Sequence, residues 1–597
     1  MCRIAGIIDK NTSVRHIEKD VKAMCYAMKH GGPDGEGFYA DPAVGLQFGH
    51  RRLALIDLSP TGHQPMLYQN DNLAITFNGE IYNYRAITQD LQSKGFEFKT
   101  KSDTEVILAA YAAWGIESFR KLIGMFAFAI HDKLNQQTYI VRDQAGIKPL
   151  YYSIVNNRLI FASEVKAFNS GSFVYEENKD WKTYFLAFGH IPHPFTTLKN
   201  VNSLSAGHFL NWNHQLNTAT IVRFKEAAAN KTISENKAAS EIIGSQFTKA
   251  VINNLIADAP IGVFLSGGID SSIITLIADR HVGKRLQSLS INFEEKKFSE
   301  AKYQELIAEK TQGIHNSYLV KEYDFNSDFN EIITAMDQPT NDGINSWFIN
   351  KYAKEKGLKA VLSGIGADEL FGGYPSFKRM KLIKKLKQFP RFILRLGANL
   401  PSEKLKRIYY LSYANPIGEY LFLRGFYIPQ TIAKILCISR KEVDALFENF
   451  PLDKELNGLE GEERASWFET NLFMQNQLLK DTDFMSMSHG VEVRVPFLNR
   501  DFINTTNNIS NNQRFQEKPK GILITAFKDL LPEAIWNRPK MGFSFPLQQW
   551  FLKGGRITDE KIYGNEYSRK LIRKFKSGKM HWSKAFALYQ VAKSIPN

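Results

Sequence analysis

Short runs of alternating apolar and polar residues fill roughly the first 210 positions of the chain. The alternation predicts strands at 73–77, 124–130 and 138–142, separated by turns that are rich in glycine. Apolar residues at helical spacing predict a helix at 106–114. Strands with helices interspersed between them indicate an α+β domain of packed layers.

A different pattern begins after residue 234, where continuous apolar runs alternate with stretches of helical periodicity. The expected strands are 261–265, 286–293 and 358–362, and the expected helices are 238–255 and 271–280. This alternation predicts a doubly wound parallel sheet, which is an α/β fold. Beyond residue 371 the pattern is mostly helical. Between the two patterns, 218–235 is rich in Ala, Asn and Lys and is predicted to be a linker.

The composition fits a folded protein of several domains. Of the 597 residues, 44% are hydrophobic and 23% are charged, as is ordinary for globular proteins. The net charge is +15, of which only +2 lies in the first 210 residues. A basic excess can indicate nucleic acid, a membrane surface or anionic small molecules as partners, although solvated surface cations are its commonest explanation.

Cysteine usage and the N-terminus predict the compartment. Cys2, Cys25 and Cys437 form no CxxC pair, which excludes a disulfide framework and a zinc site of that type. Asp9 interrupts the N-terminus too early for a signal peptide. No apolar run approaches the roughly 20 residues of a membrane span. We therefore expect a soluble, cytoplasmic protein.

Cys2 is a candidate nucleophile because it follows the initiator methionine. Removal of Met1 would leave a cysteine that carries both a thiol and a free α-amine. A terminal amine has an ordinary pKa of about 7.7–8.0, so it can act as a general base without a histidine. A cysteine at position 2 by itself carries little information, and further residues are needed to support this interpretation.

Four residues fit such a nucleophile. Arg52 begins a strand and can hold a carboxylate through two hydrogen bonds. Asn78 and Gly79 follow a strand, where a side-chain amide and a backbone N–H can form an oxyanion hole. Asp103 can bind an ammonium group. Each could instead be an ordinary turn or cap residue, but together with Cys2 they favour a catalytic site.

These residues lie in motifs that resemble the glutaminase domain of class II glutamine amidotransferases. The motifs are Pro33-Asp-Gly, Arg52-Leu, Asn78-Gly-Glu-Ile-Tyr-Asn, Ser102-Asp, Gly146-Ile-Lys-Pro-Leu-Tyr-Tyr and Phe161-Ala-Ser-Glu. The resemblance implies an α+β N-terminal-nucleophile hydrolase sandwich at residues 2–215. In it, Cys2 attacks the side-chain amide of glutamine and releases ammonia, with Asn78 and Gly79 as further catalytic groups. The implied glutamine-binding residues are Arg52, Asn78, Gly79, Glu80 and Asp103. One position departs from the family, whose His-Arg-Gly-Pro-Asp motif has Gly31 here in place of the arginine.

A glycine-rich loop, Leu265-Ser-Gly-Gly-Ile-Asp-Ser-Ser, lies between an expected strand and an expected helix. Its small residues let backbone N–H groups approach phosphate oxygens at the positive end of the helix dipole. Asp270 can bind magnesium, and the serines can donate hydrogen bonds to phosphate. The loop is not a Walker A motif, because no Gly-Lys-Ser/Thr follows. Its alternative interpretation is an ordinary corner between a strand and a helix.

A second loop, Ser363-Gly-Ile-Gly-Ala-Asp, follows another buried strand, and Asp368 offers a second oxygen ligand for magnesium. Both loops fall at the carboxyl edge of one parallel sheet, where such folds bind ligands. The pair suits a magnesium-bound triphosphate that is cleaved between its α and β phosphates. Lys520 or Lys540 could offset charge on the phosphates, although most lysines are surface residues. The polar segments 481–488 and 492–497 could close the crevice.

These loops resemble the synthetase domain of glutamine-hydrolysing asparagine synthetases and their relatives, the β-lactam synthetases and polysaccharide amidotransferases. The resemblance implies an α/β ATP-pyrophosphatase-type domain at residues 235–597 with a helical C-terminal part. It implies that ATP and Mg²⁺ activate a carboxylate as an acyl-adenylate, which ammonia from an internal tunnel then attacks. Lys520 would be the catalytic lysine, and Asp270 and Asp368 would hold magnesium. The implied ATP-binding residues are Leu265, Ser266, Gly267, Gly268, Asp270, Ser271, Ser272, Ile291, Ser363 and Gly364. The family also implies a homodimer.

The predicted acceptor is aspartate, which would yield asparagine, glutamate, AMP and pyrophosphate. A sugar uronate of a surface polysaccharide is the alternative acceptor. Ile365 keeps that alternative open, since many asparagine synthetases have glutamate there, and Asn499 replaces a frequent aspartate. A further possibility is an inactive glutaminase half and the use of free ammonia.

A third hypothesis is a nucleic-acid or membrane-surface binder. Its support is the cationic segment 378–387, followed by Arg391 and Arg395, whose helical spacing predicts an amphipathic helix with a solvated cationic face. As the main function it leaves Cys2 and both glycine-rich loops unexplained. We therefore expect the partners to be glutamine, ATP and the acceptor, with no nucleic acid and no membrane.

Overall fold

Two antiparallel sheets of six strands each form the N-terminal part of the protein, which we describe from a computed structural model covering residues 2–224, 231–542 and 544–594. The first sheet has the order β10-β8-β9-β1-β3-β2 and the second β12-β11-β7-β6-β5-β4. The first contains β1 (Arg3–Ile8), β2 (Gly35–Asp41), β3 (Leu46–Arg52), β8 (Tyr151–Val155), β9 (Arg158–Ala162) and β10 (Asn202–Ser203). The second contains β4 (Met66–Tyr68), β5 (Leu73–Ile81), β6 (Gly124–Asp132), β7 (Gln137–Arg142), β11 (His208–Asn213) and β12 (Thr218–Arg223).

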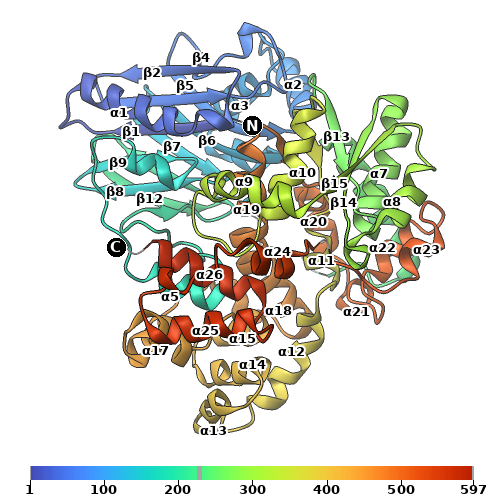
Figure 1. Cartoon of the computed structure of the whole chain (residues 1–597). Helices are drawn as coiled ribbons and strands as arrows, with labels where there is room; N and C mark the ends of the chain where they lie inside the picture. Colours follow the sequence, from blue (N-terminus) through green and yellow to red (C-terminus); the bar gives the residue numbers. More distant parts are fainter. Residues whose placement is uncertain (1, 225–230, 543, 595–597) are drawn as a thin grey trace.

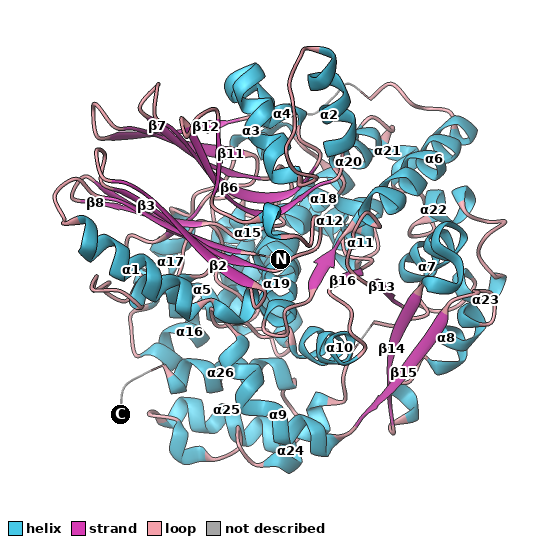
Figure 2. Cartoon of the chain, turned by 90° about the horizontal axis from the view of Figure 1, so that it is seen from above, coloured by secondary structure: helices cyan, strands magenta, loops and turns pink. Residues whose placement is uncertain are grey.

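The two sheets lie face to face, as Figure 2 shows, and bury an apolar layer between them. Ile4 of β1, Phe48 of β3 and Leu210 of β11 belong to this layer and are fully buried. Alternate residues of β1 point to the opposite face of the first sheet, where Ala5 and Ile7 pack with helix α1 (Val14–Ala27). The expected α+β sandwich is confirmed, together with α3 (Asp103–Trp114) on the second sheet.

A five-stranded, fully parallel sheet forms the centre of the second part, in the order β15-β14-β13-β16-β17. Its strands are β13 (Ile261–Phe264), β14 (Gln287–Phe293), β15 (Ile314–Val320), β16 (Ala360–Leu362) and β17 (Glu492–Arg494). Chain order reverses between β13 and β16, so the loops that follow these two strands meet at the switch point of a doubly wound sheet. Helices α6 (Asn236–Asn254) and α7 (Ile269–Val282) flank β13 in sequence.

The remainder is helical, as predicted. From α11 (Ala367–Phe371) to α26 (Trp582–Lys593), β17 is the one strand among the described residues. Figure 1 places the antiparallel sheets at the top, the parallel sheet on the right and most of these helices below. An apolar cluster continues across the two parts, from Leu53 and Met125 to Ile291 and Val493. Within the described residues, no helix is both long and apolar enough to span a bilayer.

Two local predictions were wrong. The first six residues of the expected linker, Thr218–Arg223, form strand β12, and residues 225–230 lie outside the described ranges. This edge strand pairs only with β11 and its side chains are largely exposed, so it lacks the apolar alternation that reveals a strand. Glu492–Arg494 is not a polar cover of the crevice but the buried strand β17. Its charged residues, Glu492 and Arg494, are buried as an ion pair, so the strand has the composition of a polar segment.

Candidate active sites

Cys2 immediately precedes β1, an interior strand of the first sheet, and its side chain is buried. The Sγ atom lies 3.8 Å from the backbone carbonyl of Leu53, its hydrogen-bond acceptor. Burial raises the pKa of the Cys2 thiol to about 11. The thiol is therefore protonated at neutral pH, and attack on an amide needs a base that accepts its proton.

Asn78 and Gly79 lie on β5, on the strand that pairs with β6. The Oδ1 and Nδ2 atoms of Asn78 are buried and have no hydrogen-bond partner among the described residues. Gly79 has φ of +155°, and a Cβ added to it would lie 2.1 Å from the backbone oxygen of Met125. The Asn78 amide N–H groups have no partner among the described residues, and unpaired buried donors of this kind can stabilise an oxyanion.

The other predicted glutamine-binding residues are held in different ways. Arg52 donates to the backbone carbonyls of Ser59 and Asp57, which fixes its guanidinium at the end of β3. Asp103 accepts a hydrogen bond of 2.9 Å from the backbone N–H of Ile81, and burial raises its pKa to about 7.

The carboxylate of Glu80 faces the synthetase part of the chain. Its Oε1 lies 3.3 Å from the guanidinium of Arg494, which also pairs with Glu492 at 2.7 Å. Arg494 and Glu492 belong to β17, at the edge of the parallel sheet. This buried ion-pair group joins the strand of the candidate oxyanion hole to the sheet that carries the glycine-rich loops.

Sequence reasoning missed Arg3, the first residue of β1. Its side chain is fully buried, with Nε 2.6 Å from Glu164 and Nη1 2.8 Å from Asp483 of the synthetase part. The two carboxylates raise the pKa of Arg3 although burial opposes them. A Cβ added to Gly31 would lie 2.8 Å from Cγ of Arg3. Arg3 therefore occupies the space that a side chain at residue 31 would need. An arginine next to the nucleophile in an otherwise apolar strand was the available signal.

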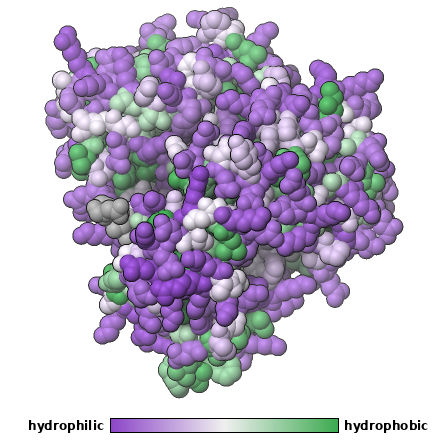
Figure 3. All heavy atoms as spheres, in the orientation of Figure 1, coloured by the Kyte–Doolittle hydropathy of each residue, from purple (hydrophilic) through white to green (hydrophobic). Residues whose placement is uncertain are grey.

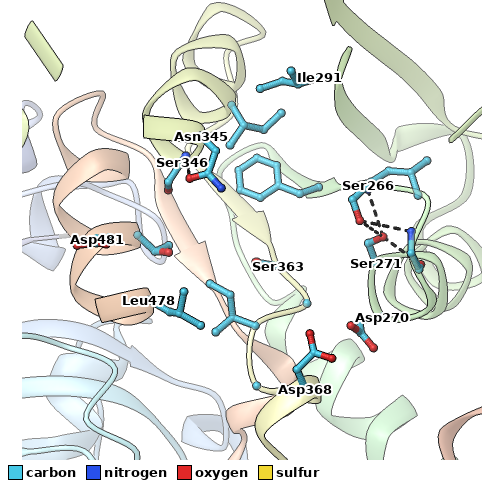
Figure 4. A pocket seen from close by; sticks show the side chains of 18 of the residues that line it. Ser266, Asp270, Ser271, Ile291, Asn345, Ser346, Ser363, Asp368, Leu478 and Asp481 are labelled. Atoms are coloured by element: carbon cyan, nitrogen blue, oxygen red, sulfur yellow. Dashed lines mark hydrogen bonds between the residues drawn. The ribbon is translucent and has the colours of Figure 1, made fainter. Parts of the chain in front are cut away.

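A cavity of about 280 Å³ lies at the switch point of the parallel sheet. Figure 4 shows residues of both loop regions around it, with Ser266, Asp270 and Ser271 from the first and Ser363 and Asp368 from the second, and Asp270 lies next to Asp368. Eight of the ten predicted ATP-binding residues line the cavity: Leu265, Ser266, Gly268, Asp270, Ser271, Ile291, Ser363 and Gly364.

The other two predicted ATP-binding residues, Gly267 and Ser272, do not line this cavity. Gly267 has φ of +77°, and a Cβ there would lie 2.9 Å from Cβ of Tyr303, so it shapes the turn. Ser272 is fully buried in α7. Arg538, whose role the sequence did not reveal, donates to the Gly267 carbonyl at 2.9 Å and lies 3.8 Å from the ring centroid of Tyr303. Arg538 therefore contacts this turn without lining the cavity.

Lys520 joins the two predicted magnesium ligands. Its Nζ lies 2.5 Å from Oδ2 of Asp270 and 2.6 Å from Oδ1 of Asp368, and its side chain is only 7% exposed. Burial alone would raise the pKa of Asp368, but the cations of Lys520 and Lys540 outweigh burial and lower it. Lys520 also has φ of +60°, which is strained for a residue with a side chain and marks a position fixed by its surroundings.

The opposite wall of the cavity is acidic. Asp342 and Asp481 line it together with Asn345 and Ser346, and Asp481 comes from α19 (Leu479–Met487). Burial raises the pKa of both Asp342 and Asp481. The negative charge of Asp342 raises the pKa of Asp481 further, although the hydrogen bond from Thr340 and the cation of Lys480 oppose this shift. Ile365 also lines the cavity. Figure 4 shows Asp481 and Asn345 on the side away from the Ser266 loop.

Comparisons with known proteins agree for both parts of the chain. A family profile described as asparagine synthase matches residues 243–575, and one described as a glutamine amidotransferase domain matches residues 1–223. The chain is 30% identical to glutamine-hydrolysing asparagine synthetase 1 of Bacillus subtilis (strain 168), over 92% of this chain and 88% of that protein. It is 34% identical to a putative glutamine-hydrolysing asparagine synthetase 2 of Methanocaldococcus jannaschii, over 70% of this chain and 86% of that protein.

Among solved structures, a glutamine phosphoribosylpyrophosphate amidotransferase from B. subtilis aligns with 54% of this chain and 81% of its own, at 16% identity and a TM-score of 0.30. The two family profiles cover the sandwich and the parallel-sheet part in the expected order. The chain therefore belongs to the asparagine synthase family of ATP-dependent ligases and carries a glutamine amidotransferase domain at its N-terminus.

Proposed function

We propose that the protein converts aspartate to asparagine, with ATP as the energy source and glutamine as the nitrogen donor. The observation that carries this proposal is the contact of Lys520 with both Asp270 and Asp368, which line the cavity together with residues of the two glycine-rich loops. Family membership supports glutamine-dependent, ATP-driven amidation. The identity of the acceptor, the AMP and pyrophosphate products and the domain limits 2–215 and 235–597 are our proposals.

In the glutaminase reaction, the α-amine of Cys2 accepts the thiol proton once Met1 is removed, and the sulfur attacks the glutamine carboxamide. The oxygen of that carboxamide becomes an oxyanion, which Asn78 Nδ2 and the Gly79 N–H stabilise. The ammonium of Cys2 returns the proton to the leaving nitrogen, so ammonia departs and a thioester remains. Water then hydrolyses the thioester to glutamate. Arg52 would hold the α-carboxylate of glutamine and Asp103 its α-ammonium group.

In the synthetase reaction, the acceptor carboxylate attacks the α-phosphorus of ATP and pyrophosphate leaves. The N–H groups around Ser266 and Gly268 would bind the phosphates at the start of α7, and Lys520 would offset the charge that develops on them. Leu265, Ile291, Ser363 and Gly364 would contact adenosine. Ammonia then attacks the acyl carbon, and AMP leaves with its bonding electron pair.

Magnesium fits the two aspartates. Asp270 and Asp368 face the same cavity, and Oδ1 of Asp270 is buried without a hydrogen-bond partner among the described residues. Two carboxylates suit Mg²⁺, which takes its remaining ligands from phosphate oxygens and water. When bound there, the ion would supply charge neutralisation of the triphosphate.

Ammonia released at Cys2 must reach the synthetase site without passing through bulk water. The apolar cluster that contains Met125 and Leu53, whose backbone carbonyl accepts a hydrogen bond from Cys2, also contains Val493 and Ile291, which lines the cavity. Apolar walls between the two sites support transfer of ammonia through the protein, because a neutral molecule does not lose strong solvation there.

The acidic wall supports aspartate over a sugar uronate. Asp342 and Asp481 offer two carboxylates to a cationic group. An amino-acid acceptor carries an α-ammonium group that can pair with them, whereas a uronate carries none and would add repulsion. Incubation of the full chain with ATP, Mg²⁺ and glutamine tests this: aspartate should yield equal amounts of AMP and asparagine, and AMP that depends on a uronic acid instead would refute the acceptor.

A further inference from the structure

The chain carries most of its net charge in one exposed segment. Residues 375–407 contain eleven lysines and arginines and one glutamate, a net charge of +10 out of the +15 of the whole chain. The segment comprises α12 (Pro375–Leu386), α13 (Arg391–Arg395), a 3-10 turn and α14 (Glu403–Lys406). We call it the basic–apolar tip. Figure 1 shows it at the lower end of the molecule, opposite the antiparallel sheets.

The tip also exposes large apolar side chains. The exposed fractions are 52% for Phe389, 69% for Phe392 and 60% for Leu396. Leu382, Ile393 and Leu405 of the same segment are exposed as well. In Figure 3 a group of apolar side chains lies at this end, in a surface that is mostly hydrophilic. Exposed apolar groups that cluster beside cations indicate an interaction surface rather than ordinary surface variation.

Internal packing does not account for these side chains. The amphipathic helix predicted at 378–387 is confirmed as part of α12, and it buries Phe377, Met380 and Ile383. The apolar face of α12 is therefore already covered by the protein. Phe392 and Leu396 come from the next turns of the chain and project away from that packing.

Several cations of the tip also have no ion-pair partner among the described residues. Among the described residues, no carboxylate lies within 4.0 Å of the amino or guanidinium groups of Lys384, Lys385, Arg391 and Arg395, although Lys387 pairs with Glu419 at 2.6 Å. Unpaired cations next to exposed aromatic and aliphatic groups match two features of an anionic membrane surface, its charged headgroups and its acyl boundary.

We propose that the basic–apolar tip docks the protein on an anionic lipid surface. Phe389, Phe392 and Leu396 enter the boundary between headgroups and acyl chains, while the surrounding lysines and arginines bind the headgroup phosphates and carboxylates. A second copy of this chain is a poor occupant, because two tips of charge +10 would repel each other. The binding is peripheral. It is independent of the proposed reaction, because no residue of the tip lines the proposed ATP cavity.

The test uses the full chain and vesicles of phosphatidylcholine with phosphatidylserine, compared with vesicles of phosphatidylcholine alone. Co-sedimentation should occur with the anionic vesicles only, and it should weaken as salt is added. The double variant Lys384→Gln/Lys385→Gln should bind roughly 25-fold more weakly, since each cation near the surface contributes about fivefold. Phe392→Ser should weaken binding roughly tenfold by removing apolar burial.

The matched control is Lys570→Gln/Lys574→Gln, which removes two exposed lysines from another basic helix, α25 (Glu566–Lys576). It should bind vesicles as the wild type does. Equal loss in the control and in the tip variant, or equal binding to neutral vesicles, would overturn the proposal. Tip-dependent binding of single-stranded RNA without vesicle binding would overturn it in favour of nucleic acid, and a tip variant that changes the sedimenting mass would assign the tip to a subunit interface. All substituted side chains are exposed, and unchanged thermal unfolding verifies that each variant folds.

Discussion

Arg3 and Asp483 form a buried ion pair, with Nη1 2.8 Å from Oδ2, that joins the strand next to the nucleophile to helix α19 of the synthetase part. Asp481, on the same helix, lines the cavity at the switch point of the parallel sheet. The pair is thus a direct physical link between the two candidate sites.

We expect Arg3→Gln to uncouple the two reactions. Loss of the link should raise the amount of glutamate formed per pyrophosphate about fivefold or more, the usual scale of coupling between sites. Asp483→Asn should have the same effect on this ratio, and the double variant should add little to it, because each substitution removes the Arg3–Asp483 pair that links the two sites. Lys359→Gln breaks a different ion pair between the two parts, with Asp34 at 2.7 Å, and should leave the ratio unchanged. Parallel loss of ammonia-driven synthesis would show a general folding defect instead.

The raised pKa of Asp103 predicts that the use of glutamine depends on pH. Because burial raises its pKa to about 7, the carboxyl is neutral below that pH and cannot attract the α-ammonium group of glutamine. The kcat/KM for glutamine should fall as pH drops below about 7, and Asp103→Asn should lower kcat/KM and flatten this limb. A variant profile that keeps the wild-type slope would assign the titration to another group.

The same burial has a consequence for stability. Ionised Asp103 is unfavourable in the folded chain, so its contribution to stability is fully present below the ordinary pKa of 3.8 and is lost as pH rises through about 7. Asp103→Asn should therefore gain stability relative to the wild type as pH increases across this range. Thermal unfolding of the two proteins at several pH values measures the difference.

Gly267→Ala should weaken ATP binding. The substitution places a Cβ 2.9 Å from Cβ of Tyr303 at a φ of +77°, so the turn that shapes the first loop must shift. We expect the KM for ATP to rise about tenfold or more, because a shift of about 1 Å in groups that position a substrate can cost up to roughly 100-fold. Gly283→Ala is the control: it has φ of +58° but no atom nearer than 3.9 Å, so it should affect stability without changing the KM for ATP. Equal changes in both variants would contradict the role of the Tyr303 contact.

Lys520→Met should abolish synthesis and spare the glutaminase. Removal of the ammonium leaves Asp270 and Asp368 without the charge that pairs them and removes compensation of the phosphates. Pyrophosphate formation should fall roughly 10²–10³-fold, as for loss of one group that stabilises developing charge. Glutamate release, followed in the same samples, should stay within about twofold. Normal pyrophosphate formation in the variant would remove Lys520 from the mechanism.

The two glycine-rich loops could be predicted from sequence because each combines a local pattern with a defined place in a parallel sheet. The cavity brings Asp270 and Ser363 together as expected. The contacts of Arg3 could not be predicted, since its partners Glu164 and Asp483 are distant in sequence and only the packed domains bring them together. Strand β17 could not be predicted for the same reason. Its charged residue Arg494 can be buried only because Glu80, which is distant in sequence, pairs with it.

We propose that Cys2 supplies ammonia to a separate, ATP-driven site. The most direct measurement is pyrophosphate formation by Cys2→Ala with aspartate and ATP, using either glutamine or an ammonium salt. We expect a loss of about 10³-fold or more with glutamine, because the variant lacks the nucleophile, and near-normal turnover with ammonium. Unchanged turnover of Cys2→Ala with glutamine would contradict it.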